Sequence, residues 1–379
     1  MLYDIIIKNG TVIDPSRKIH KVEDIYIYKD SIMLPPKNND VKARQVIDAH
    51  GYYVMPGLIE NHTHIFYGGG DLSIPADVIM LPSGVTSAID HGSSGIANFD
   101  IFYRSVVKNS LINIKAYLNV NNIGIATERY FEDIDPKYFD KDQIKYYYRK
   151  YSDTILGLKI RLCKESCKNM GLYPLEKTIE IAEEVGCPIS VHVKNPSVPI
   201  PEIAKLLRKG DVWVHMYQVS GDTILNKDNN IYRELYNAKE RGVIFDVASG
   251  RRGFTFDLIK RALNQDFKPD LLGTDLVAFN VYERPLFSLV YTMSMYLNLG
   301  FSIDEVVALC TNAPAKVMDL EKHIGTLKED SIADVCIMKL CEKDIEFFDM
   351  HGGNLKGEQL LVPQMTIKSG KVVYRNIEF

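Results

Sequence analysis

Several features that mark specialised protein classes are missing from this sequence. No uninterrupted apolar run approaches the roughly 20 residues that a membrane-spanning helix needs, so we expect no membrane partner. The formal net charge is only -4 over 379 residues, and this lack of excess positive charge argues against nucleic acid as a partner. These absences leave a small molecule as the expected ligand.

Dense cysteine pairing and a leader-like start are missing too. The six cysteines are scattered along a long chain, which favours reduced thiols, at positions 163, 167, 187, 310, 336 and 341. Cys163 and Cys167 have no second pair beside them, so they support a cysteine zinc site only weakly. The start, MLYDIIIKNG, places Asp4 and Lys8 around a very short apolar run, unlike the basic-then-apolar layout of a signal peptide. We therefore expect a cytoplasmic protein.

Both ends of the chain have the alternating pattern of β-strands. YDIIIKNGTVID carries the turn pair Asn9-Gly10 between two runs of Ile and Val, which predicts a hairpin, and EDIYIYKDSIM follows it. Near the other end, IGTLKEDSIADVCIM and PQMTIKSGKVVYRN, with Ser369-Gly370, repeat the pattern. We expect residues 1–54 and 322–379 to build one small β-sandwich domain together.

Residues 55–321 follow a different rhythm, in which short apolar runs alternate with amphipathic stretches of helical period. The helical stretches include LEKTIEIAEEV (175–185), IPEIAKLLRKG (200–210) and the polar, aromatic segment 135–153. The apolar runs are YVMPGLIENH, GVTSAIDHG, IKAYLNVN, ILGLKIRL, CPISVHV, DVWVHMY, GVIFDVA and PDLLGTDL. Eight strands with helical crossovers predict an α/β fold, a (β/α)8 TIM-like barrel of the usual ~250 residues.

Polar residues inside these runs are informative, because parallel barrel strands are buried on both faces. They fall mostly in the C-terminal halves of the runs, which open into the single mouth where active sites of such barrels lie. We therefore expect them to converge. Imidazole and carboxylate ligands favour zinc, with manganese, iron or nickel as alternatives. The polar residues are His62, His64, Asp90, His91, Asn119, Asn121, Lys159, His192, His215, Asp246 and Asp275.

Each of these residues also has a purely structural explanation. A single His in a strand is often a hydrogen-bonded core residue, and an Asp at a strand end often caps the next helix. Lys159 is harder to explain in this way, because an unpaired ammonium in a barrel core must find a partner, lose its proton or be modified. His62 and His64 form an H-x-H that aims both rings to one side of an extended strand. We predict a metal site.

Several motifs together carry a resemblance to a known family. They are PGLIENHTH, the lysine of GLKIRL, the histidines of ISVHV and VWVHM, and the Asp of LLGTDL, with DIIIKNGTVIDP and TNAPAKVMDL…IGTLKEDSIADVCIM towards the two ends. In this set the chain resembles the amidohydrolase superfamily of metal-dependent hydrolases over nearly its whole length. GVTSAIDHGSSGIANF and LKIRL look most like the deacetylase-type members, whose relatives cleave small N-acyl or O-acyl compounds.

The resemblance implies a ligand set for two divalent metal ions, zinc first. His62 and His64 would hold the more buried ion, with Asp275 on the same side. Lys159, carboxylated on its amine, would bridge both ions, while His192 and His215 would hold the second. Asp275 would be the catalytic base that takes a proton from a water between the metals and passes it to the leaving group.

The chain departs from the family pattern at two places that bear on the site. Glu60 stands where the family usually has Asp, and Ala248-Ser249-Gly250 stands where deacetylase-like relatives tend to carry Gly-His-Gly. Arg251 and Arg252 follow, either to meet a substrate carboxylate or phosphate or as a solvated loop. Because they follow or sit beside strand ends, the candidate substrate contacts are His91, Ser93, Asn119, Arg161, Asn195, Tyr217, Ser249 and Arg251.

The leading function is therefore hydrolysis of an amide or ester bond in a small acylated compound. A cyclic amide or imide hydrolase, dihydroorotase- or hydantoinase-like, would share the metal chemistry and differ only in its pocket. Dihydroorotase has an Arg two residues after the second His of H-x-H, whereas this chain has Phe66 there. A non-catalytic barrel is a third possibility. By analogy with the family we expect a homo-oligomer.

Overall fold

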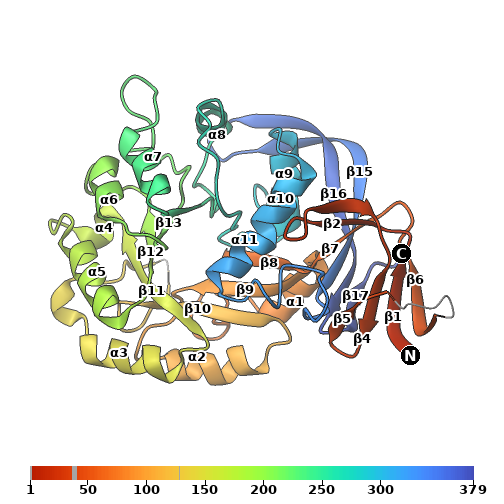
Figure 1. The fold of residues 1–379 in the computed structure, drawn as a ribbon. Coiled ribbons are helices and arrows are strands. Elements are labelled where there is room, and N and C mark those ends of the chain that lie inside the picture. The colour runs from red at the N-terminus through yellow and green to blue at the C-terminus, as the bar shows by residue number, and fades with distance from the viewer. Residues whose placement is uncertain (1, 36–40, 128) are drawn as a thin grey trace.

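The computed structural model describes residues 2–35, 41–127 and 129–379 (Figure 1). A barrel-like body surrounded by helices occupies one side of the molecule, and a smaller β body containing both chain ends occupies the other. No helix in the described residues is long and apolar enough to cross a membrane. All six cysteines are free thiols.

Seven parallel strands form the curled sheet at the centre of the larger body. Their order in the sheet is the reverse of their order along the chain, β14-β13-β12-β11-β10-β9-β8. Their bounds are β8 (Leu58–Thr63), β9 (Val85–His91), β10 (Asn113–Asn119), β11 (Ile155–Leu162), β12 (Ile189–Val193), β13 (Val212–Val214) and β14 (Ile244–Asp246).

The eighth apolar run joins the two edges of this sheet. Leu271 makes a parallel bridge to Asp246 at the end of β14, and Leu276 makes one to Thr63 at the end of β8. Residues 271–276 therefore occupy the place of the eighth barrel strand, although they pair with each edge through an isolated bridge and not through a continuous ladder. The predicted TIM-like barrel is confirmed.

Helices cover the outside of the barrel. The expected helix 175–185 lies within α5, and the expected helix 200–210 ends early, with α6. Segment 135–153 contains one short turn and then α3, because the carboxylate of Asp140 caps the backbone N–H of Gln143 and starts the helix there. The α-helices are α1 (Ala76–Met80), α2 (Phe99–Ser105), α3 (Lys141–Lys150), α4 (Lys164–Cys167), α5 (Tyr173–Val185), α6 (Ile200–Leu206), α7 (Arg233–Glu240), α8 (Phe256–Leu263), α9 (Leu289–Asn298), α10 (Ile303–Cys310) and α11 (Asn312–Val317), with 3-10 turns at Leu81–Ser83, Val107–Asn109 and Pro136–Tyr138.

The smaller body is a sandwich of two sheets that enclose an apolar core. One sheet has the order β5-β4-β1-β6 and the other β17-β16-β15-β7-β2-β3, so strands from both chain ends share the second sheet. The strands are β1 (Leu2–Lys8), β2 (Thr11–Asp14), β3 (Ile19–Val22), β4 (Ile25–Tyr28), β5 (Ser31–Met33), β6 (Lys42–Asp48), β7 (Tyr53–Pro56), β15 (Val335–Phe348), β16 (Asn354–Lys368) and β17 (Lys371–Arg375). The expected β-sandwich built from both ends is confirmed. The finer division at residues 54/55 and 321/322 stays a prediction.

Two local predictions were wrong. The pair Asn9-Gly10 does not join a hairpin: β1 pairs with β4 and β6, whereas β2 pairs with β3 and β7 in the other sheet. The turn carries the chain across the sandwich, and a side chain at Gly10 would lie 2.4 Å from Val54. The run YVMPGLIENH is two strands, because the chain leaves the sandwich after β7 and enters the barrel at β8, with Gly57 pressed against Thr86 between them.

The strand–turn–strand pattern predicted around Ser369-Gly370 is confirmed by the antiparallel pairing of β16 and β17, and the strand-like segment EDIYIYKDSIM forms a further antiparallel pair, β4–β5.

Candidate metal centre

The backbone of the eighth run is bonded to the end of β8, and this contact brings Asp275 to the H-x-H pair. The Asp275 N–H donates to the carbonyl of His62 at 2.8 Å, and the hydroxyl of Thr63 donates to the carbonyl of Leu276 at 3.0 Å. Asp275 Oδ1 consequently lies 3.7 Å from His62 Nε2 and 3.4 Å from His64 Nε2. One ligand atom from each of the three side chains lies within 4.8 Å of the others, a grouping able to hold a metal ion.

The ionisation of this group suits a cation. Burial and neighbouring positive charges hold the pKa of His62 well below its usual value, so its imidazole is neutral. Burial pushes the pKa of Asp275 upward, but the contact with His64 and the nearby charges outweigh it and lower that pKa overall. A neutral imidazole beside an ionised carboxylate is the donor set that a divalent ion requires.

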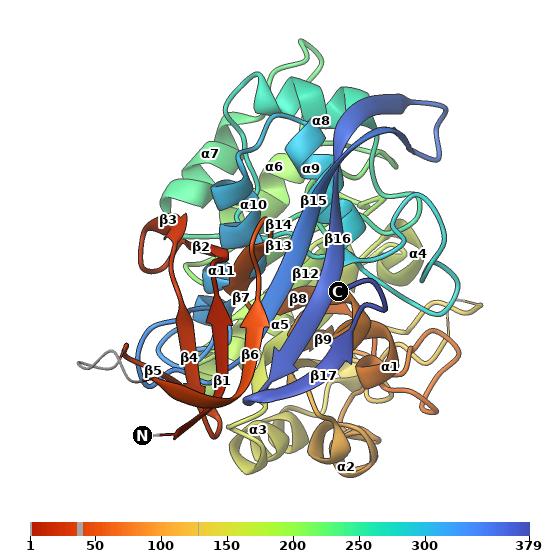
Figure 2. The ribbon, with the colours of Figure 1, turned by 90° about the vertical axis from the view of Figure 1, so that its right-hand side faces the viewer.

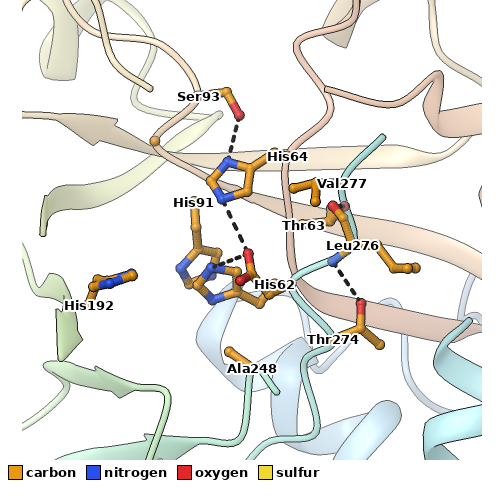
Figure 3. Close-up of polar contacts among 12 residues, drawn as sticks. His62, Thr63, His64, His91, Ser93, His192, Ala248, Thr274, Leu276 and Val277 are labelled. Atoms are coloured by element: carbon orange, nitrogen blue, oxygen red, sulfur yellow. Dashed lines mark hydrogen bonds and ion pairs between the residues drawn. The ribbon is translucent and has the colours of Figure 1, made fainter. Parts of the chain in front are cut away.

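The outer nitrogens of three imidazoles are all engaged, which fixes their tautomers. His62 Nδ1 lies 3.2 Å from Asp246 Oδ2, and His215 Nδ1 lies 2.5 Å from the carbonyl oxygen of Ala248. His64 Nδ1 lies 2.9 Å from the hydroxyl oxygen of Ser93, and Figure 3 marks this contact with a dashed line. An acceptor faces each Nδ1, so the tautomer with its proton on Nδ1 satisfies all three contacts and leaves each Nε2 lone pair available to a metal ion. Two of those lone pairs, on His62 and His64, face Asp275.

The predicted second set of ligands is held by β12 and the end of β13. His215 Nε2 lies 2.8 Å from His192 Nδ1, so two ring nitrogens face each other directly. Burial depresses both pKa values, that of His192 well below its usual value and that of His215 to about 3. His215 has a positive φ of 65°, a strained backbone that recurs at functional sites. Two neutral imidazoles with converging nitrogens suit a second cation.

Lys159 lies in β11 and is almost completely buried, with 1% of its surface exposed. Its amine donates to Ser190 Oγ at 3.3 Å. Burial lowers its pKa to about 7. Gly92 makes room for the stem, because a side chain there would lie 2.7 Å from Lys159 Cγ. Of the three outcomes expected for this lysine, burial favours loss of the proton, and modification of the amine stays a prediction.

Carboxylates behind the histidines complete the centre. Asp246 is fully buried, contacts His62 Nδ1 and accepts the Gly273 N–H at 2.9 Å, and burial raises its pKa to about 7. The Ser93 hydroxyl donates to Asp90 Oδ2 at 2.7 Å, so Asp90 supports His64 through Ser93. Such partners fix the ring orientation of metal-binding histidines. The sequence marked Asp90 and Asp246 as buried polar residues, but not which imidazole each supports.

Glu60 acts on the backbone of the centre. Its carboxylate accepts the N–H of His62 at 3.0 Å, and from Thr274 it accepts the N–H at 3.0 Å and the hydroxyl at 2.7 Å. Burial raises its pKa to about 8 despite these donors. Glu60 therefore joins β8 to the eighth run and fixes the spacing between His62 and Asp275.

Three of the candidate substrate contacts lie among the buried residues that pack below or beside the centre. The ring of His91 stacks on that of His62 at 3.7 Å, and its Nε2 has no hydrogen-bond partner in the described part of the chain. Asn119 Nδ2 donates to the carbonyl of Gly92 at 3.1 Å. The hydroxyl of Tyr217 donates to the carbonyl of Phe267 at 3.0 Å. These contacts place the three side chains in the packing around the centre, and their role as substrate contacts stays a prediction.

A cavity of ≈ 310 Å³ opens onto the centre, since His192 and Asp275 are part of its wall. Two of the candidate substrate contacts, Arg161 and Asn195, also line it. Arg161 Nη1 lies 3.2 Å from Glu132 Oε2. The wall comprises Tyr130, Phe131, Arg161, Cys163, Glu165, His192, Lys194, Asn195, Ser220 and Asp275. Sequence reasoning missed Lys194, although it directly follows the apolar run CPISVHV, and Glu132, which lies near none of the eight apolar runs.

The loop after β14 carries two more candidates, Ser249 and Arg251. Ser249 is buried, and its hydroxyl has no hydrogen-bond partner among residues 2–35, 41–127 and 129–379. The guanidinium of Arg251 lies 3.8 Å from the carboxylate of Glu283. Neither residue is in the wall of the cavity described above.

The comparisons with known proteins agree with this architecture. The model of the amidohydrolase family matches residues 53–373, and the chain belongs to that family, as the motifs predicted. A deacetylase of Agrobacterium fabrum is 30% identical over 330 residues, 87% of this chain and 81% of the relative. The crystal structure of an adenine deaminase superposes with a TM-score of 0.89 at 27% identity, covering 99% of this chain and 100% of the other. That of a dihydroorotase gives 0.87 at 28% identity, with 98% of each chain covered.

Proposed function

We propose that this protein is a metal-dependent hydrolase that cleaves an amide or ester bond of a small acylated compound, as a deacetylase does. The observation that carries the proposal is the convergence of His62, His64 and Asp275, with their Nε2 and carboxylate atoms aimed at one point. The similarity of this chain to a deacetylase over most of both chains supports the same function.

The proposed cofactor is a pair of divalent ions, zinc first. His62, His64 and Asp275 would hold one ion, and His192 and His215 the other. Lys159, carboxylated on its buried amine, would bridge them, which would also remove the cost of an unpaired ammonium. When bound, the ions would supply a Lewis acid for the substrate carbonyl and would bring the pKa of a water molecule to about 7.

Asp275 is the proposed catalytic residue, acting as general base and then general acid. Its side chain is 23% exposed and borders both the imidazoles and the cavity, so it is positioned to take a proton and to give it to the leaving group. Its lowered pKa keeps it ionised and ready to accept. Arg161 and Asn195 in the cavity wall are the proposed substrate contacts, and Ser249 and Arg251 remain candidates from the neighbouring loop.

A cyclic amide hydrolase is the second candidate, because the fold also superposes closely on a dihydroorotase. Phe66 argues against a dihydroorotase activity. Its side chain is 3% exposed, and its ring packs against that of Phe102 at 5.0 Å. It offers no cation for a substrate carboxylate at the position where dihydroorotase has Arg. The deacetylase-like reading is therefore preferred.

The experiment measures the metal content of the purified protein and its turnover of N-acetyl amino acids, acetyl esters, hydantoins and dihydroorotate. We expect bound metal and hydrolysis of an acetylated compound. Asp275→Asn should lower kcat by about 10²–10⁴-fold, the usual contribution of a general acid-base group, without loss of the fold. Asp228→Asn, on an exposed loop, is the control. Hydrolysis of ring substrates alone would favour the second candidate, and a metal-free, inactive protein would refute both.

A further inference from the structure

The hairpin of β15 and β16 extends far beyond the sandwich to which it belongs. β15 pairs with β7 only from Val335 to Met338, whereas its pairing with β16 continues to Phe348. Figures 1 and 2 show the two strands running past α9 to a tip beside α8. Leu361 N–H donates to Ser294 Oγ of α9 at 2.9 Å, and the fully buried Phe347 packs against Tyr291 at 5.0 Å. The arm is therefore docked onto the barrel.

The tip of this arm, residues 349–353, is organised around one carboxylate. Asp349 is 7% exposed, and its Oδ1 accepts the N–H groups of His351 and Gly353, both at 2.8 Å. Its Oδ2 accepts the N–H of Phe256, the first residue of α8, at 3.0 Å. A carboxylate is favoured at this place because the first N–H groups of a helix lack partners within the helix. His351 adds a second contact, with Nε2 3.3 Å from the carbonyl oxygen of Arg252.

The loop that the tip holds, residues 248–255, also touches the metal centre. The carbonyl of Ala248 accepts from His215 Nδ1, and the N–H of Gly250 donates to the carbonyl of Thr274 at 3.0 Å. Gly250 packs so closely on Asp275 that a side chain there would lie 2.9 Å from Oδ2. The same loop therefore contacts one residue of each proposed set of metal ligands, His215 of one and Asp275 of the other.

One residue of this loop is strained, which makes the anchors of the loop important. Ala248 has φ 35°, in the region that side-chain-bearing residues avoid, whereas Gly250 at φ 53° is a glycine in a conformation that glycine adopts readily. A conformation such as that of Ala248 persists only where surrounding structure holds it. β14 holds one end of the loop, and the start of α8, bound by Asp349, holds the other.

We infer that Asp349 is a positioning residue for the metal centre: the hairpin tip of the sandwich holds loop 248–255 against His215 and Asp275. Asp349 itself touches neither His215 nor Asp275, so its effect on them passes through α8 and the loop. The expected effect of Asp349 on turnover rests on the proposed function, but the contact between the hairpin tip and the loop does not depend on that function.

The test compares Asp349→Ala with Asp349→Asn, which keeps an oxygen to accept the Phe256 N–H. Glu346→Ala is the matched control, because this carboxylate lies on the same arm and accepts from Asn354 at an exposed edge. The measurements are kcat and KM on the compound of the panel above that the wild type hydrolyses fastest, the visible absorption spectrum of the cobalt-loaded protein, and hydrogen exchange of residues 249–256. We expect Asp349→Ala to lower kcat about 10–100-fold, as for other groups that orient metal ligands, and to change the cobalt spectrum.

Asp349→Asn should recover part of kcat, and Glu346→Ala should match the wild type in all three measurements. Hydrogen exchange in the loop should rise in Asp349→Ala. Wild-type kcat, cobalt spectrum and loop exchange in Asp349→Ala would overturn the inference, even if that variant were less stable. If it does not fold, His351→Ala removes the second contact, and an unchanged loop exchange and spectrum in that variant would overturn it equally. A wild type without metal or turnover would refute the proposed function, while loop exchange would still decide whether the tip holds the loop.

Discussion

Asp246 provides the sharpest test of how the centre is held. It is fully buried, and one of its oxygens lies 3.2 Å from His62 Nδ1 while the other accepts the Gly273 N–H. Replacing it with Asn keeps the volume but removes the charge that favours the Nδ1–H tautomer of His62. The Nε2 lone pair is then no longer guaranteed to face the metal.

The expected loss of metal affinity in Asp246→Asn can be judged from two independent ranges of free energy. A hydrogen bond to a charged group contributes about 1.5–3 kcal/mol. Loss of the group behind a metal-binding His weakens metal affinity about 10–100-fold, which corresponds to roughly 1.4–2.7 kcal/mol. Because the ranges overlap, we expect Asp246→Asn to raise the metal Kd by about 10–100-fold, and the stabilisation by metal to fall by the matching free energy.

The assay is chelator competition together with thermal unfolding with and without metal. Since burial raises the pKa of Asp246 to about 7, it is run at about pH 8, where the carboxylate is ionised. Asp211→Asn is the control: this Asp is equally buried and accepts the Ile189 N–H at 2.9 Å, but it lies before β13, at the opposite end of the barrel. The variant Asp211→Asn should therefore lower the stability of the fold and leave the metal affinity unchanged. Equal metal affinity in the two variants would refute the reasoning.

Three further predictions concern other parts of the molecule. Lys159→Met cannot form a carbamate, so we expect less bound metal and no turnover. Because the change also removes a buried amine, we expect no loss of stability. Elemental analysis and thermal unfolding measure the two effects, and full metal content would contradict the prediction. Arg161→Lys loses the planar guanidinium group that can bind a carboxylate of the substrate through two parallel hydrogen bonds. In steady-state kinetics KM should therefore rise about 10-fold with kcat nearly constant, and an unchanged KM would exclude Arg161 as a substrate contact. Lys368→Met breaks the buried pair with Asp334, whose atoms lie 2.8 Å apart, and should cost about 3–5 kcal/mol in urea unfolding with kcat unchanged; a loss below ~1 kcal/mol would show that the pair is dispensable.

The fold was largely predictable because the apolar runs carry their own period and length. The errors arose where partner choice depends on distant segments. Asn9-Gly10 has the local signal of a hairpin turn, yet β1 pairs with β4 and β6. A turn pair specifies backbone dihedrals and not which sheet the next strand joins.

The residues of the centre were predictable because strand ends of a barrel share one mouth. The roles of their neighbours were not. Tyr217 follows His215, whose positive φ turns the chain, so the alternation of a strand no longer indicates where the next side chains point. Asp246 of β14 contacts His62 of β8, and Glu60 of β8 contacts Thr274 of the eighth run. These segments lie far apart in the sequence and meet only because the barrel closes. The cytoplasmic location and the homo-oligomeric state stay predictions.

The place of β7 inside its sheet has a consequence for synthesis on the ribosome. β7 lies between β2, made just before it, and β15, made only after the entire barrel. Until β15 emerges, one edge of β7 offers unpaired backbone groups, the usual starting point for pairing with another chain. The nascent protein must therefore protect that edge throughout translation of the barrel, and a premature stop before residue 335 would leave it open for good.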